Sequence, residues 1–202
     1  MNERTRVLVI NGSYRDDGIT HQIVHAAAEA VRAAGAELET VNLRDYPIEF
    51  CLNCRECTQK SGEAPGACVL QDGMQALIEK IEGADAYILA SPTNFGSVTA
   101  VFKRFMERLV AYTYWPWGDD YPKLRKAHAL RKKALLVSSC AAPGILGRWL
   151  YGTHTQLKTT AQTIGADPVG TLFTGLVAND PDHQLPQRAR DRAKSLVTRL
   201  LG

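Results

Sequence analysis

Several features that identify common classes of protein are missing from this chain of 202 residues. No apolar run approaches the ~20 residues that a membrane-spanning helix requires. The first residues, MNERTRVLVINGS, carry charges but lack the apolar core and cleavage site of a secretory signal. The net charge is only +3, and no motif typical of nucleic-acid binding accompanies it. These absences predict a cytoplasmic protein with neither a membrane nor a nucleic-acid partner.

Cysteine is scarce along most of the chain, because four of the five cysteines fall within residues 51–68. In a reducing compartment such a cluster indicates metal binding or thiol chemistry rather than structural disulfides. Cys51, Cys54 and Cys57 have the spacing C-x-x-C-x-x-C, which can hold three corners of an iron–sulfur cube, and Cys68 offers a fourth ligand. Zinc more often uses two separate C-x-x-C pairs. A structured loop with partly buried thiols is the remaining interpretation.

Repeats, linkers and low-complexity tracts are also missing, so we expect one domain over residues 1–202. Apolar runs typical of buried strands alternate with helical patterns along the chain. Parallel strands joined by right-handed helical crossovers build a three-layer α/β sandwich, here with a five-stranded parallel sheet. The predicted strands are residues 6–10, 37–43, 86–90, 134–138 and 169–174.

Helix boundaries are predicted from capping patterns and apolar spacing. Asp72 and Gln75 have the spacing of a capping box ahead of an apolar run, which predicts a helix start. Ser97 is the predicted N-cap of the next helix. One continuous helix is expected over residues 146–164.

Ligands in such sheets bind beyond the carboxyl ends of the strands, so the loops after the first, third and fourth strands are the candidate site. The first loop, residues 11–24, leaves a strand and enters a helix, where free backbone N–H groups and the helix dipole favour phosphate. Ser13 and Thr20 add hydroxyls, and Arg15 adds a guanidinium. Neither a Walker motif nor G-x-G-x-x-G is present. An ordinary polar turn is the alternative.

The second loop, SPTNFGS at residues 91–97, has the composition that a flat heteroaromatic ligand needs. Its backbone can meet the ring edge while the aromatic side chain of Phe95 meets the ring face. The third loop, SSCAAPG at residues 138–144, has small residues that permit close backbone approach. Each loop can also be read as a simple turn.

Together GSYR…GIT, SPTNFGS and the strand–helix order resemble the NADPH-dependent FMN reductase family, a flavodoxin-like group. The resemblance implies a dimer or tetramer that binds FMN, with NAD(P)H as co-substrate and a small molecule as electron acceptor. It also implies which residues contact FMN, while FMN itself carries the chemistry. The implied phosphate contacts are Ser13, Arg15, Gly18, Ile19 and Thr20, the ring contacts are Pro92, Thr93, Asn94, Phe95 and Gly96, and Ser139 and Cys140 lie near the other ring edge.

The resemblance also includes an iron–sulfur flavoprotein branch, which places a compact cysteine motif in the same region of the chain. Cys51, Cys54, Cys57 and Cys68 would then hold a [4Fe–4S] cluster. The ten residues between Cys57 and Cys68 exceed the spacing of that compact motif, and a loop without a cluster is the competing interpretation. The predicted function is therefore an FMN-dependent NAD(P)H oxidoreductase reducing flavin, quinone or a similar acceptor. The alternative is an electron-transfer protein with FMN and a cluster.

Two further segments have open interpretations. The aromatic segment at residues 111–122 indicates either local core or an interface or lid. We expect Tyr112, Trp115 and Trp117 to line the flavin face, either of the same subunit or of a neighbouring one. The basic run at residues 123–133 is typical of a solvated face, with the 2′-phosphate of NADPH as a second possibility.

Overall fold

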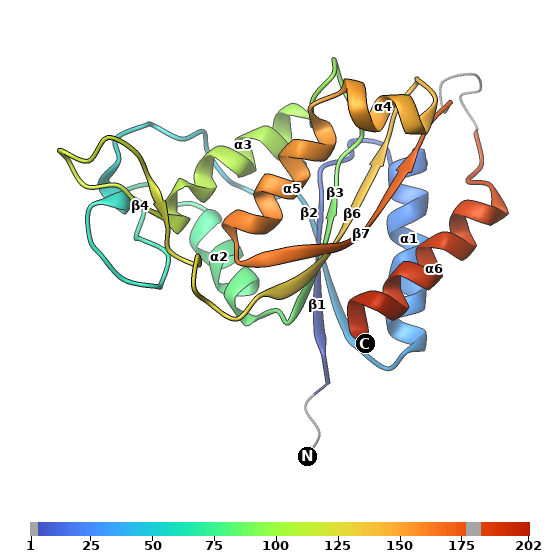
Figure 1. The fold of residues 1–202 in the computed structure, drawn as a ribbon, viewed down its shortest axis with the longest axis horizontal. Coiled ribbons are helices and arrows are strands. Elements are labelled where there is room, and N and C mark those ends of the chain that lie inside the picture. Colours follow the sequence, from blue (N-terminus) through green and yellow to red (C-terminus); the bar gives the residue numbers. More distant parts are fainter. Residues whose placement is uncertain (1–3, 177–182) are drawn as a thin grey trace.

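The computed structural model describes residues 4–176 and 183–202, which fold around one twisted parallel sheet (Figure 1). The strand order is β2-β1-β3-β6-β7, and every neighbouring pair is parallel. The predicted five-stranded parallel sheet is therefore confirmed. Its strands are β1 (Arg6–Asn11), β2 (Glu37–Asn42), β3 (Ala86–Ala90), β6 (Lys132–Ser139) and β7 (Ala166–Thr174).

Helices cover both faces of the sheet, and two separate cores lie between the layers (Figure 1). Alternate residues of β1 point to opposite faces: Leu8 and Ile10 enter one core, and Val7 and Val9 enter the other. The first core packs against α2 (Met74–Gly83), α3 (Ala100–Arg108) and α5 (Thr153–Thr163), and the second against α1 (Ile19–Ala33) and α6 (Gln187–Leu201).

A smaller substructure extends from one side of the sandwich (Figure 1). It contains the cysteine loop, the short helix η1 (Glu56–Thr58), the turn η2 (Leu109–Tyr112) and an antiparallel ribbon of β4 (Thr113–Tyr114) and β5 (Lys123–Leu124). The backbone amide of Trp115 donates to the carbonyl of Thr58, which ties the ribbon to the cysteine loop. The sequence analysis did not predict this ribbon, because its strands are only two residues long.

Two predicted helix caps are wrong. Asp72 does accept from the backbone N of Met74 at 2.9 Å, but Gln75 bonds Glu79 instead of completing a capping box. Thr99, not Ser97, is the N-cap of α3 and accepts from the backbone N of Phe102. The Ser97 side chain bonds Gln156 of α5 instead, whereas Gln75 bonds a neighbour on its own helix. The helix start predicted near Asp72 is confirmed, because α2 begins at Met74.

The predicted helix over residues 146–164 is also wrong, because it is two helices. The first, α4 (Gly144–Leu150), ends at an extended Tyr151, and α5 begins after Gly152. The backbone N of Gly152 donates to the carbonyl of Gly96 at 2.9 Å, so a contact with the loop after β3 coincides with the break. Among the described residues, no helix is long and apolar enough to cross a membrane.

Candidate active site at the carboxyl edge of the sheet

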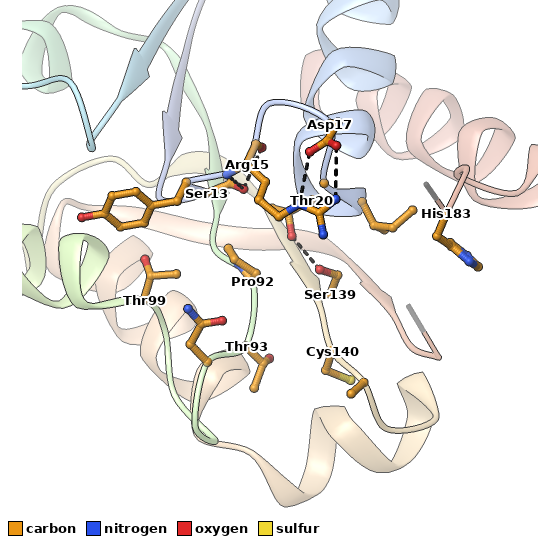
Figure 2. Close-up of a pocket in the computed structure, with 15 residues that line it drawn as sticks. Ser13, Arg15, Asp17, Thr20, Pro92, Thr93, Thr99, Ser139, Cys140 and His183 are labelled. Atoms are coloured by element: carbon orange, nitrogen blue, oxygen red, sulfur yellow. Dashed lines mark hydrogen bonds and ion pairs between the residues drawn. The ribbon is translucent and has the colours of Figure 1, made fainter. Parts of the chain in front are cut away.

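A pocket of about 300 Å³ opens where β1, β3 and β6 end. Figure 2 shows labelled side chains converging from the loop after β1, the loop after β3 and the end of β6, with His183 added from the segment ahead of α6. These are the three loops expected from the sequence. The lining residues are Ser13, Tyr14, Arg15, Asp17, Gly18, Ile19, Thr20, Pro92, Thr93, Asn94, Thr99, Ser139, Cys140, Ala141 and His183.

The loop after β1 presents an uncapped helix start to this pocket. Gly18 is the N-cap of α1, and within the described part of the chain this helix start has no side-chain cap hydrogen bond. Such N–H groups are available to an anion, and the helix dipole favours one there. Ser13 is 5% exposed and its backbone N is held by the side chain of Asn11 at 3.0 Å. The geometry at this end of the pocket therefore fits a phosphate monoester.

Arg15 is engaged with a carboxylate in this structure. Its Nε and Nη2 lie 3.1 and 3.2 Å from the two oxygens of Asp17 (Figure 2). The hydrogen bond from Arg15 lowers the pKa of Asp17, which therefore stays ionised at neutral pH. The sequence analysis predicted Arg15 as a phosphate contact and did not include Asp17. A phosphate bound here would compete with Asp17 for the guanidinium.

Hydroxyl groups line the wall formed by β6. Thr20 Oγ1 and Ser139 Oγ are 2.7 Å apart and buried, which joins the start of α1 to the end of β6. The backbone N of Thr93 donates to the carbonyl of Ser139 at 2.8 Å. Because both bonds involve Ser139, they connect all three loops and hold them in one position relative to one another. Cys140 is 3% exposed, and burial raises the pKa of its thiol.

Phe95 and Gly96 are the two predicted FMN contacts that do not line the pocket. They form the tip of a tight turn between Asn94 and Ser97, whose backbone groups exchange hydrogen bonds of 2.8 and 3.0 Å. Both tip residues have positive φ, 50° and 77°, as in a type I′ turn. This turn directs the Phe95 side chain to full exposure. Phe95 therefore does not line the pocket of its own chain, and its contact with the ring stays a prediction.

Two side chains near the start of α5, Thr153 and Gln156, hydrogen-bond to the loop after β3 and form a clamp on it. Gln156 Oε1 accepts from Ser97 Oγ and from the backbone N of Val98, each at 2.9 Å. Thr153 Oγ1 donates to Thr93 Oγ1 at 2.9 Å. Thr93 lines the pocket, and Thr153 is fully buried. The clamp thus fixes a pocket residue through long-range bonds that no local pattern reveals.

Replacing Gln156 with alanine is expected to weaken FMN binding about 10-fold. The change leaves the buried amide of Val98 without its acceptor, which costs about 1–3 kcal/mol and loosens the loop. Fluorescence titration of FMN checks this, with Gln162→Ala on the same helix as the control. Gln156→Glu keeps an acceptor oxygen and is expected to recover most of the affinity. Equal affinities in Gln156→Ala and Gln162→Ala would contradict the clamp.

Several pocket residues were missed by the sequence analysis: Tyr14, Asp17, Thr99, Ala141 and His183. Tyr14 and Asp17 lie inside the predicted loop and could have been included by position. His183 comes from a distant segment, which Gln22 holds by donating to the His183 carbonyl and accepting from Leu185 N. No local signal in the sequence indicates that contact.

The four clustered cysteines also come together, at a second and smaller cavity of about 60 Å³. Cys51, Cys54, Cys57 and Cys68 line it with apolar neighbours. Non-glycine residues with positive φ, Asn53 and Arg55, turn the chain between the cysteines. Within residues 4–176 and 183–202 no three metal-binding side chains are close enough to form a ready metal site. Because all four cysteines line one cavity, the donor set fits a thiolate-bound metal centre chemically, although the thiol positions do not form a ready site for a single ion.

Close packing and buried charge shape the cysteine loop. Burial, followed by the neighbouring thiols, raises the pKa of Cys57 to about 11. Arg108 donates to Cys68 Sγ at 3.4 Å. At Gly66 a Cβ would lie 1.7 Å from the Cys57 carbonyl oxygen, so only glycine allows this approach.

The aromatic segment belongs to the cysteine loop and not to the first pocket. Tyr112 is a core residue whose hydroxyl donates to Glu82 at 3.0 Å. Trp115 lines the cysteine cavity, and Trp117 donates its backbone N to Gln59. None of the three lines the first pocket of its own chain, and a contact with the flavin of a neighbouring subunit stays a prediction. The basic run is not simply a solvated face either, because Arg125 is only 9% exposed.

Comparison with known proteins identifies the family. The family model described as NADPH-dependent FMN reductase matches residues 5–170. The chain belongs to the NADPH-dependent FMN reductase family. The resemblance that the loops predicted is therefore confirmed.

Individual proteins match this member of the FMN reductase family either over only half of the chain or at low sequence identity. An iron–sulfur flavoprotein of Methanocaldococcus jannaschii is 34% identical over 103 residues, 51% of each chain. The chain spans about half the length of the curated relatives it matches. An NAD(P)H:quinone oxidoreductase from Methanothermobacter marburgensis superposes with a TM-score of 0.67 at 17% identity, covering 98% of this chain and 97% of that one. An FMN-dependent NADH-azoreductase from Bacillus anthracis, in complex with FMN, gives 0.65 at 15% identity, covering 98% and 100%. These structures confirm the flavodoxin-like fold.

Proposed function

We propose that the protein is an FMN-dependent NAD(P)H oxidoreductase that reduces free flavin, a quinone or a similar small acceptor. The observation that carries the proposal is the pocket at the carboxyl edge, where an uncapped helix start and a hydroxyl-lined wall converge. Family membership supports the same cofactor. FMN, when bound, supplies the hydride and electron transfer, so the protein needs no catalytic side chain of its own.

The residues of the pocket have separate tasks in this proposal. The first turn of α1, with Ser13 and Thr20, would bind the phosphate, and Arg15 would offset its charge. Thr93 and Asn94 would meet the ring system, with Ser139 and Cys140 toward its other edge. The clamp from α5 would hold the ring loop in place. The absorbance spectrum of the purified protein and NAD(P)H oxidation with a quinone test the proposal. Protein that binds no FMN when mixed with it would refute the proposal.

Replacing Asp17 with asparagine is expected to tighten FMN binding. The change removes a carboxylate beside the proposed phosphate site and, with it, the ion pair between Asp17 and Arg15. Because both side chains are exposed, the gain should be about 3- to 10-fold at low salt and shrink at high salt, where such charges are screened. Equilibrium titrations at two salt concentrations measure it. Asp16→Asn is the matched control, since Asp16 pairs with Arg44 outside the pocket. Unchanged affinity in Asp17→Asn would contradict the assignment.

A second function is proposed on the cysteine cavity. The four cysteines that line it, and the relatives named iron–sulfur flavoproteins, favour a [4Fe–4S] centre that exchanges single electrons with a protein partner. Anaerobic purification with iron and acid-labile sulfide assays tests it. Full FMN with sub-stoichiometric iron, even after reconstitution with iron and sulfide, would refute this second function and leave the first intact.

The oligomeric state is part of the same proposal. We expect a homodimer or homotetramer, because exposed apolar side chains flank the first pocket: Phe95, Ile145, Trp149 and Leu150. Exposed patches of this kind commonly mark protein interfaces. Sedimentation analysis of the FMN-bound protein tests the expectation. A monomer at all concentrations would show that the patch has another role.

A further inference from the structure

Two arginines, Arg55 and Arg108, line the cysteine cavity, and a third, Arg125, contacts the main chain of the cysteine loop. Among the described residues, neither Arg55 nor Arg125 has a carboxylate partner. Arg108 is paired with Asp72 at 2.6 Å. Arg125 instead donates only to main-chain carbonyls, and Arg55 is stacked between two indole rings. The carbonyls that Arg125 contacts belong to Cys57, Lys60, Gly62, Ala111 and Thr113.

Arg55 lies within the cysteine motif and is held rigidly. Its Cζ is 3.6 Å from the ring centre of Trp115 and 4.3 Å from that of Trp117. Its Nη2 donates to the carbonyl of Trp115 at 2.7 Å. Its backbone has φ of 60°, a conformation that costs a non-glycine residue about 1–2 kcal/mol. The surrounding contacts therefore impose one position on this side chain.

One donor of Arg55 has no acceptor. Its Nε is buried and makes no hydrogen bond in the part of the chain that the structure describes. Arg55 itself lines the cavity together with the four cysteines. An unsatisfied buried N–H of a cation is costly, and buried polar groups normally have partners. The missing acceptor and the missing countercharge are both properties that an anion in the cavity would supply.

Because four cysteines line the cavity beside a cation, the anion that fits best there is a metal–sulfur cluster bound by thiolates. A metal–sulfur cluster bound by thiolates is anionic, and its negative charge grows by one when it takes up an electron. Its reduction potential depends on net charge and on hydrogen bonds to its sulfur atoms. Cations and N–H donors around the cavity stabilise the reduced form more than the oxidised form.

We propose that Arg55 is a hydrogen-bond donor and countercharge for a thiolate-bound iron–sulfur centre in this cavity, with Arg125 as a second countercharge behind the loop. The proposal rests on the second function above. Within it, Arg55 sets the reduction potential of the centre and favours its reduced form. The stacking of Arg55 on Trp115 and Trp117 then has a purpose, because it positions the cation beside the cysteines.

The test compares arginine variants of the full-length protein after anaerobic reconstitution with iron and sulfide. Arg55→Gln removes the charge, and Arg55→Lys keeps it. Arg104→Gln is the matched control, because Arg104 also has a buried Nε without an acceptor and a cation–π contact, with Phe50, but does not line the cavity. Potentiometric titration followed by electron paramagnetic resonance measures the potential, and chemical assays measure iron and sulfide.

Arg55→Gln is expected to make one-electron reduction of the centre about tenfold less favourable, a shift of about 59 mV to lower potential. Arg55→Lys should recover most of the shift, and Arg104→Gln should show none. Loss of cluster loading in Arg55→Gln, with unchanged FMN content and circular dichroism, would also support the proposal.

If Arg55→Gln matches the wild type in iron content and reduction potential, Arg55 serves only to pack against Trp115 and Trp117, and the proposal is overturned. If the wild type takes up no iron and sulfide, the second function fails and this inference fails with it. FMN content and NAD(P)H oxidation report separately on the leading function. If Arg55→Gln is misfolded, the neutral variants Arg55→Met and Arg104→Met are compared instead, and equal reduction potentials in these two variants overturn the proposal.

Discussion

Ser13→Asp is expected to weaken FMN binding by at least about 100-fold. Ser13 is 5% exposed in the pocket wall, so an aspartate there would face the phosphate with little water to screen it. Two unit charges about 4 Å apart interact by about 4 kcal/mol at an effective dielectric constant of 20, and each 1.4 kcal/mol is a factor of about ten in affinity. Fluorescence titration and the FMN content of the purified variant measure the loss.

The control for this prediction is Ser13→Asn, which has nearly the same shape as aspartate and no charge. We expect Ser13→Asn to retain FMN with a loss of about tenfold or less, the value of a typical hydrogen bond. Thermal unfolding of both variants separates loss of binding from loss of structure. Retention of FMN by folded Ser13→Asp would contradict the assignment of the loop after β1 to the phosphate.

Arg108→Met is expected to lower the free energy of unfolding by about 3–5 kcal/mol, the usual cost of removing one partner from a buried ion pair. The Arg108 side chain is 1% exposed and that of Asp72 is 9% exposed. Arg108 also donates to the carbonyl of Glu49 at 2.8 Å and to Cys68 Sγ. The variant leaves the Asp72 carboxylate buried without its cation. Urea unfolding measures the change, and a loss below about 1 kcal/mol would show that the pair contributes little.

The comparison that isolates the pair is a double-mutant cycle with Asp72→Asn. Because the two side chains are in direct contact, the double variant should be less destabilised than the sum of the single variants. FMN binding should be retained, since neither residue lines the first pocket. Exposed pairs such as Lys103 with Glu107 serve as a control and should contribute less than about 1 kcal/mol.

The ion pair between Arg108 and Asp72 also predicts how the free energy of unfolding depends on pH. Burial raises the pKa of Asp72, but hydrogen bonds from Arg108 and from the amides of Glu49 and Met74 outweigh it and hold the pKa below 3.8. A carboxyl group whose pKa is depressed on folding stabilises the protein fully above its unfolded pKa. This contribution is therefore present above pH 3.8 and is lost as the pH falls further. In Asp72→Asn that part of the acid dependence should be absent.

Local patterns predicted the sheet well because a buried strand is specified by its own residues. The run at 86–90 matches β3 at both ends, since every residue of that strand is buried and apolar. The three ligand loops followed from the strand positions, because parallel strands end at one edge. Helix ends were predicted less well, as Ser97 and the break before Gly152 illustrate, since their side chains or backbone groups bond partners far along the chain.

The sequence by itself determined the class of fold, the family and the edge of the sheet where the candidate pocket lies. Each of these depends on residues close together in the chain. Tertiary structure alone decided that Phe95 leaves the pocket, that Gln156 and Thr153 hold its ring loop, and that Arg125 from the basic run binds the carbonyls of the cysteine loop. The physical reason is that hydrogen bonds and buried charges join residues that are adjacent only after the chain has folded.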